Sequence, residues 1–94
     1  MIKVLILTDD IEGWTTKLEK ELKAPKILKY KNQVIIQTEL FYFHIQRYIS
    51  ESMRGYAFSC AIIDKPIDRK FECDVLRPCV KCSIITTKDC YLSY

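Results

Sequence analysis

Five apolar runs separated by polar segments set the pattern of the chain. They cover residues 2–7, 27–30, 33–38, 57–63 and 80–87. Short apolar runs that are rich in β-branched side chains and bounded by polar residues are typical of buried strands. The pattern therefore predicts a strand in each run, and the second and third runs form either a hairpin or one bent strand.

Between the first two runs, apolar side chains recur at helical spacing. Ile11, Trp14, Leu18 and Leu22 follow one another at steps of three and four residues, which places them on one face of a helix. Asp9 precedes this stripe and has an acidic residue three positions later, which is the spacing of a capping box. The pattern predicts a helix that begins after Asp9 and ends before the next proline.

A similar period fills residues 39–53, where Phe41 and Ile45 would share a helical face. This spacing predicts a second helix, although the aromatic stretch that begins at Phe41 also fits a strand continuing from Val34. A third, shorter helix is expected within residues 67–78.

Alternation of strands and helices indicates parallel strands joined by right-handed crossovers. Residues 1–94 are accordingly expected to form a single small three-layer α/β domain with a mostly parallel sheet of four to five strands. Ligands of such folds bind at the carboxyl ends of the strands. The polar residues that fall at these ends are Thr8, Asp9, Asp64, Thr86 and Thr87.

Composition narrows the class of protein. The chain has 94 residues, of which 49% are hydrophobic, and a net charge of +3, which is too mild to require a nucleic-acid partner. No run approaches the roughly 20 apolar residues of a membrane helix, and the first run is unlike a signal peptide. We expect a cytoplasmic protein with no membrane partner.

Lysines crowd the first third of the chain. Three of them, Lys17, Lys20 and Lys23, recur every three positions in the first predicted helix and could share one of its faces. Such a row is either a solvated helix face or a strip that contacts nucleic-acid phosphates.

Four of the five cysteines gather in the last quarter, namely Cys73, Cys79, Cys82 and Cys90. Four thiolates that include one C-x-x-C pair suit zinc, but these spacings match no common zinc finger. Plain thiols, a zinc site and a redox pair all stay open, and no other cofactor is expected. The single histidine, His44, lies between aromatic residues and is expected to be a partly exposed packing side chain.

From residue 54 onwards, several features follow in a known order. Arg54-Gly55 precedes an apolar strand that ends in Asp64, and Arg77-Pro78 precedes a strand that ends in Thr86-Thr87. With the first strand and helix, this order resembles the ATPase core of phage terminase large subunits, and of P-loop NTPases more broadly, over most of the chain. The resemblance implies a viral or phage protein of the host cytoplasm, with a remnant of a nucleotide and magnesium site at Asp64, Thr86 and Thr87.

Two parts of that family's machinery are missing. P-loop enzymes cradle phosphates with G-x-x-x-x-G-K-[ST], but Gly13 and Gly55 are the chain's only glycines. The catalytic Glu that follows the strand-end acid in the family is here Lys65, which cannot activate a water molecule. The resemblance therefore implies a truncated version without catalysis, and an ordinary strand-end acid is the simpler alternative for Asp64.

A receiver domain is a second resemblance. Asp9, Asp10 and Asp64, together with Thr86, would imitate its phospho-acceptor pocket. The spacing from Asp64 to Thr86 is short for that family, and the strand that carries its lysine is missing.

The sequence favours a phage-encoded accessory protein that is not an enzyme and that binds and modulates a protein partner such as an NTPase. Its many tyrosines support this prediction, because exposed Tyr is a common interface anchor. Two alternatives stay open. One is a nucleic-acid-binding factor that uses Lys17, Lys20 and Lys23, and the other is a residual nucleotide or magnesium binder at the strand ends.

Overall fold

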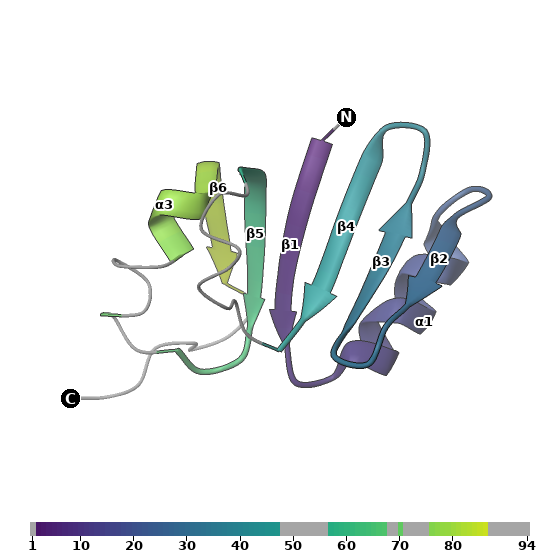
Figure 1. Cartoon of the computed structure of the whole chain (residues 1–94), viewed down its shortest axis with the longest axis horizontal. Coiled ribbons are helices and arrows are strands. Elements are labelled where there is room, and N and C mark those ends of the chain that lie inside the picture. Colours follow the sequence, from purple (N-terminus) through teal and green to yellow (C-terminus); the bar gives the residue numbers. More distant parts are fainter. Residues whose placement is uncertain (1, 48–56, 68–69, 71–75, 87–94) are drawn as a thin grey trace.

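The computed structural model describes residues 2–47, 57–67, 70 and 76–86, with the backbone alone at 82, 83 and 86. These residues build one six-stranded sheet with helical segments against it (Figure 1). The elements in chain order are β1 (Ile2–Thr8), α1 (Ile11–Glu21), β2 (Lys26–Lys29), β3 (Gln33–Gln37), β4 (Phe41–Gln46), β5 (Phe58–Asp64), α3 (Arg77–Cys79) and β6 (Val80–Thr86).

The sheet is mixed, with parallel and antiparallel neighbours. Its strand order is β2-β3-β4-β1-β5-β6. The strands β4, β1, β5 and β6 run parallel to one another, whereas β3 runs antiparallel to both β2 and β4. The α/β class is confirmed, but the sheet has six strands rather than the predicted four to five, and the antiparallel strand β3 makes it mixed. The three strands β2, β3 and β4 form an antiparallel meander that joins the sheet beside β1.

The error has one source, the helix predicted over residues 39–53. Its first half is the strand β4, which hydrogen-bonds to β3 and β1, and residues 48–53 lie outside the described part. Phe41 and Ile45 are four residues apart, a spacing that suits one helical face but also one face of a strand. Phe43 decides between the two, because it packs into the same apolar cluster as Phe41 and Ile45. Three residues at steps of two share a face only in a strand.

Most of the other predicted strands are confirmed. The antiparallel pair β2 and β3 confirms the hairpin, and β1, β5 and β6 confirm the remaining strands. Most of the short helix predicted within 67–78 lies outside the described residues; residue 70 is helical, and α3 begins at Arg77, at the end of the predicted range.

Each face of the sheet has its own apolar cluster. On one face, Val4, Ile6 and Ile45 pack under the side chains of α1 that the sequence pattern had aligned: Ile11, Trp14, Leu18 and Leu22. On the other face, Leu5 and Leu7 pack against Leu76 and Cys79 at α3. Figure 1 shows α1 behind the sheet at the end of β2 and β3, and α3 beside β6 at the other end.

The start of α1 differs from the prediction by one residue. Asp10, not Asp9, is the N-cap, and its side chain accepts a hydrogen bond of 3.0 Å from the backbone N–H of Gly13. An added Cβ at Gly13 would lie 2.2 Å from a carboxylate oxygen of Asp10, so this position needs glycine while the cap is formed. Past the helix, Ala24 adopts φ 50°, in the left-handed region that suits glycine better.

Candidate functional site at the carboxyl edge of the sheet

The carboxyl ends of β1 and β5 meet at one edge of the sheet. Thr8 and Asp64 are register partners there, and both lie on the face that α1 covers. The Thr8 hydroxyl donates to the Asp64 carboxylate over 3.2 Å and accepts a hydrogen bond of 3.0 Å from the backbone N–H of Asp10. The indole N–H of Trp14 donates to the same Asp64 oxygen over 2.8 Å. Asp64 is therefore hydrogen-bonded to both β1 and α1.

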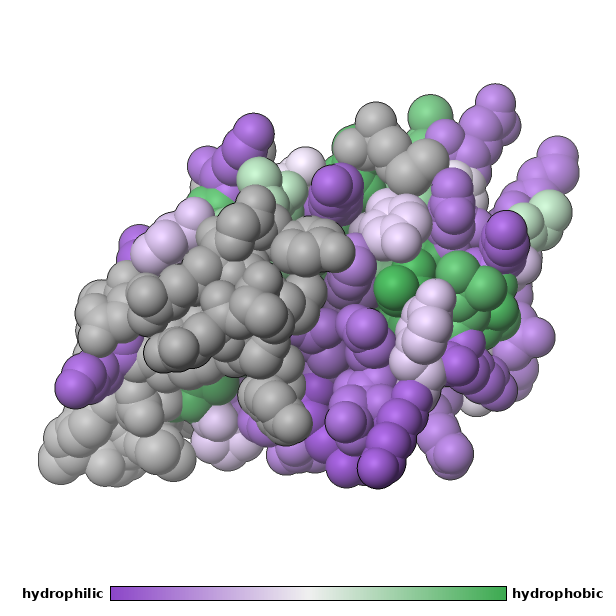
Figure 2. Space-filling model, viewed as in Figure 1, coloured by the Kyte–Doolittle hydropathy of each residue, from purple (hydrophilic) through white to green (hydrophobic). Residues whose placement is uncertain are grey.

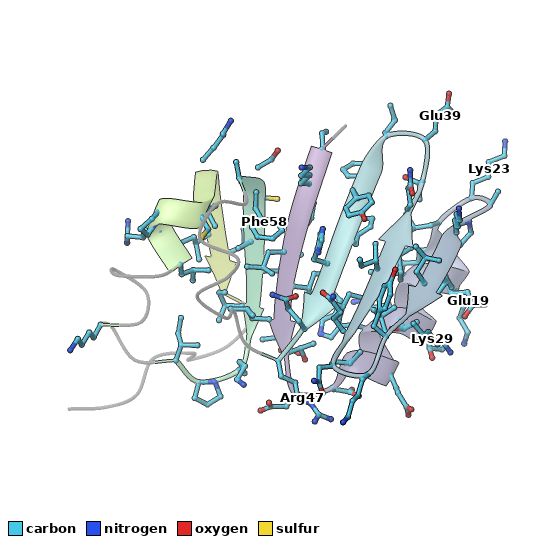
Figure 3. The ribbon with its side chains drawn as sticks, in the orientation of Figure 1. Glu19, Lys23, Lys29, Glu39, Arg47 and Phe58 are labelled. Atoms are coloured by element: carbon cyan, nitrogen blue, oxygen red, sulfur yellow. The ribbon has the colours of Figure 1, made fainter. Side chains whose placement is uncertain are left out.

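Lys65 makes a second set of contacts along this edge. Its ammonium group lies 3.0 Å from a carboxylate oxygen of Asp9 and donates a hydrogen bond of 2.7 Å to the backbone carbonyl of Arg47. Arg47 follows the end of β4, as Figure 3 shows at the lower edge of the sheet. One side chain thus ties together the ends of the three neighbouring strands β4, β1 and β5. The Lys65 side chain is only 21% exposed, whereas that of Asp9 is 68% exposed.

These contacts lie at the edge of the sheet where P-loop proteins bind phosphates. In P-loop proteins the connection from the first strand to the first helix is a glycine-rich loop whose N–H groups surround the phosphates. Here that connection is Asp9-Asp10, and the Asp10 carboxylate already accepts a helix N–H. Two carboxylates repel a phosphate, and the ammonium group of Lys65 is already paired with Asp9.

The structure places Asp64 and the backbone of Thr86 close together. Thr86 ends β6 and lies one strand beyond Asp64, opposite Ile63 in the register. The Thr86 side chain and the whole of Thr87 lie outside the described part. The grouping expected at the carboxyl edge therefore exists for Thr8, Asp9 and Asp64, and a nucleotide or magnesium role for it stays a prediction.

The three lysines of the predicted phosphate strip are exposed, but they do not form a uniformly positive face. Lys17 and Lys20 lie on α1, and Lys23 follows it. The ammonium group of Lys17 sits 5.3 Å from the centre of the Trp14 ring. The same segment contains three acids, Glu12, Glu19 and Glu21, so it has no net positive charge. Figure 3 labels Glu19 and Lys23 on this part of the molecule.

The four cysteines proposed for zinc are only partly described. Cys79 is fully buried in the apolar cluster beside α3, and Cys82 lies on β6 with its side chain undescribed. Cys73 and Cys90 lie outside the described residues. Within the part that the structure describes, no group of three or more His, Cys, Asp or Glu side chains could hold a metal ion. The zinc site stays a prediction.

His44 is more deeply buried than the sequence suggested. Its side chain is 3% exposed, with the Tyr42 ring 4.8 Å away and the Phe58 ring 5.3 Å away in an edge-to-face contact. Burial, with a smaller effect from the nearby positive charge of Lys3, holds the pKa of His44 below its usual value. The packing role is confirmed, but the predicted partial exposure is wrong.

Comparisons with known proteins agree with this architecture. The fold resembles that of a phage large terminase. Against the large terminase of a thermophilic bacteriophage, the TM-score is 0.54 at 12% sequence identity, over 90% of this chain and 24% of the terminase. The resemblance expected from the sequence is thus confirmed at the level of the fold, and the chain spans about a quarter of the length of that terminase. No protein-family model and no curated protein matches the sequence.

Sequence reasoning missed two members of this edge. Trp14 was assigned to the apolar stripe of α1, and nothing in its spacing indicated that its N–H would reach Asp64. The general need of a buried indole N–H for an acceptor was the available signal. Arg47 contributes only its backbone carbonyl, a role that no side-chain pattern can reveal.

No described helix is long and apolar enough to span a bilayer.

Proposed function

We propose that the chain is a non-catalytic accessory protein that binds and modulates a protein partner, with an NTPase as the class of partner. The observation that carries the proposal is the closed carboxyl edge. Lys65 pairs with Asp9 and Asp64 pairs with Trp14, where an active nucleotide-binding relative would hold phosphate and metal. The likeness in fold to part of a large terminase supports a protein that shares a motor's scaffold without its phosphate loop.

The opposite edge of the sheet supplies a candidate contact. Ile2 is 44% exposed and Leu40 is 65% exposed, and the backbone N–H of Ile2 donates to the Leu40 carbonyl over 2.9 Å. Two large apolar residues that are exposed and joined by this backbone hydrogen bond favour a protein partner over a small ligand. This patch, Ile2 and Leu40, lies at the amino end of β1, away from Asp64.

A thermal-shift measurement with 1 mM ATP and Mg²⁺ tests the closed edge. We expect no change in Tm. A site with a Kd of about 10 µM would add about 2.7 kcal/mol to the free energy of unfolding at this concentration. For a domain of this size, that would raise Tm by roughly 10 °C or more. Such a rise, if Asp64→Asn removes it, would contradict the proposal and favour the residual nucleotide binder.

Affinity capture tests the partner. The tagged chain is incubated with nuclease-treated host lysate, and Leu40→Asp serves as the variant. We expect one protein to be retained by the natural chain and lost by the variant, because a new carboxylate would have to be desolvated in the contact. Ile85→Asp is the matched control, since Ile85 is 52% exposed on β6, away from the patch. Equal retention by all three chains would count against the Ile2–Leu40 patch, and retention of nothing would count against the proposed function.

A further inference from the structure

The surplus positive charge of the chain lies in one hairpin. Residues 24–38, which contain β2 and β3, include Lys26, Lys29 and Lys31 but neither Asp nor Glu. The other 12 basic residues are matched by the 12 acidic residues of the chain. The net charge of +3 is therefore the charge of the hairpin, and the lysine row of α1 contributes nothing to it.

One face of this hairpin looks away from α1. Ile27, Val34 and Ile36 pack into the cluster under α1, so the alternate residues of β2 and β3 lie on the opposite face. The register sets Lys26, Gln37, Tyr42 and Lys3 side by side across the strands β2, β3, β4 and β1. The sequences of these four strands contain no acidic residue. Figure 2 shows this face, with an apolar patch bordered by hydrophilic side chains.

Two tyrosines mark a diagonal across this face. Tyr42 lies on β4 and is partly buried, whereas Tyr30 follows β2 and is 54% exposed. The backbone N–H of Tyr30 donates to the carbonyl of Gln33, which extends the register by one pair. The two tyrosines are then two strands apart across the sheet and four residues apart along it, a separation of roughly 17 Å from standard strand spacings. Ile35 lies between them on β3.

We propose that this face, Lys3, Lys26, Tyr30, Gln33, Gln37 and Tyr42, binds single-stranded nucleic acid. Lys3 and Lys26 would contact phosphates, with Lys31 beside Tyr30 at the turn. Tyr30 and Tyr42 would stack on bases, because aromatic side chains in a positively charged setting are the usual platform for unpaired bases. A duplex hides the base faces, so it could use only the lysines. This binding site is independent of the protein partner proposed above.

The glutamines favour this ligand over an apolar protein surface. Gln33 and Gln37 are partly buried at the two ends of β3 on this face. An apolar protein contact would bury their amides without partners, at a cost in free energy. Base edges offer both donors and acceptors to the same amides.

Fluorescence anisotropy with a labelled 20-nucleotide oligothymidine tests the proposal on the full chain. We expect saturable binding at 50 mM salt that weakens roughly 20-fold at 200 mM, as three phosphate contacts require. The variant Lys26→Glu/Lys31→Glu should lose at least about tenfold in affinity at 50 mM salt. The matched control is Lys20→Glu/Lys23→Glu, which makes the same change in charge at or beyond the end of α1. Its affinity for the oligonucleotide should fall less than about threefold.

The tyrosine variants separate stacking from charge. Tyr30→Ala should weaken binding about tenfold, and Tyr30→Phe should bind as the natural chain does. All substituted side chains are exposed, and circular dichroism verifies that each variant is folded. Absence of saturable binding at 50 mM salt, equal losses in the two lysine pairs, or equal affinity for a duplex would overturn the proposal. Displacement of the oligonucleotide by poly-glutamate, with Tyr30→Ala unaffected, would instead indicate an acidic protein partner.

Discussion

Trp14 and Asp64 are 50 residues apart in the chain and meet through one hydrogen bond of 2.8 Å. The contact does two things at once. It gives the indole N–H an acceptor, and it holds a partly buried carboxylate against the first helix. Hydrogen bonds to charged groups contribute more to stability than neutral ones, about 1.5–3 kcal/mol.

We therefore expect Trp14→Phe to lower the free energy of unfolding by about 2 kcal/mol or more, through loss of this hydrogen bond and of some packing. Urea denaturation of Trp14→Phe, Asp64→Asn and the double variant forms a thermodynamic cycle. Coupling between the two sites of about 0.5 kcal/mol or more is expected, since they are in direct contact. Strictly additive effects would show that the hydrogen bond contributes nothing in solution.

At the scale of one element, the start of α1 balances two opposing effects. Gly13 is a poor helix former, by about 1 kcal/mol relative to Ala. Its missing Cβ, however, leaves room for the Asp10 carboxylate that caps the helix. A cap of this kind contributes typically about 1 kcal/mol.

These two effects should nearly cancel in Gly13→Ala, which we expect to change stability by less than about 0.5 kcal/mol. Asp10→Ala should cost about 1 kcal/mol in the natural chain but little in the Gly13→Ala background, where the cap is already displaced. Thermal denaturation of the four chains measures this difference. An equal cost of Asp10→Ala in both backgrounds would mean that the cap survives beside an alanine.

The elements also show how far the sequence alone could go. Runs of β-branched residues located β1, β3 and β5, and the stripe of Trp14 and Leu18 located α1 with the correct face inward. For β4, the spacing of Phe41 and Ile45 fits both periods, and the decision came from pairing with β3 and β1. Such pairing is long-range information that no local window contains.

Only part of the carboxyl edge could be predicted from the sequence. Strand ends could be located from the apolar runs, so Thr8 and Asp64 were expected near each other. In the structure, the Thr8 hydroxyl lies 3.2 Å from a carboxylate oxygen of Asp64. The hydrogen bond from Trp14 to Asp64 depends on how α1 lies across the sheet. The ion pair of Lys65 with Asp9 depends on Asp10, rather than Asp9, being the N-cap of α1. Both are decided by tertiary packing.

At the scale of the whole molecule, His44 links stability to pH. It is the only histidine, so no other side chain has an ordinary pKa in the range between about pH 5.5 and 7.5. Burial and Lys3 lower its pKa in the folded state. The unfolded chain then binds the proton more tightly, and stability falls as pH drops through about 6.5, the ordinary value.

We expect the free energy of unfolding to decrease between about pH 7.5 and pH 5.5, by at most about 1.4 kcal/mol from this residue. His44→Phe, which keeps an aromatic ring against Tyr42 and Phe58, should flatten this dependence. Urea denaturation at several pH values compares the two chains. Parallel pH profiles would show that His44 is not the group responsible.

The hairpin lysines have a consequence for how separate copies of the protein behave. β2 is the last strand of the sheet, and its sequence places Ile27 and Leu28 between two exposed lysines, Lys26 and Lys29. A terminal strand presents unpaired N–H and C=O groups on which another chain can add, and lysines at such a strand oppose this addition. The charge that we propose to attract nucleic acid thus also protects the protein against edge-to-edge aggregation.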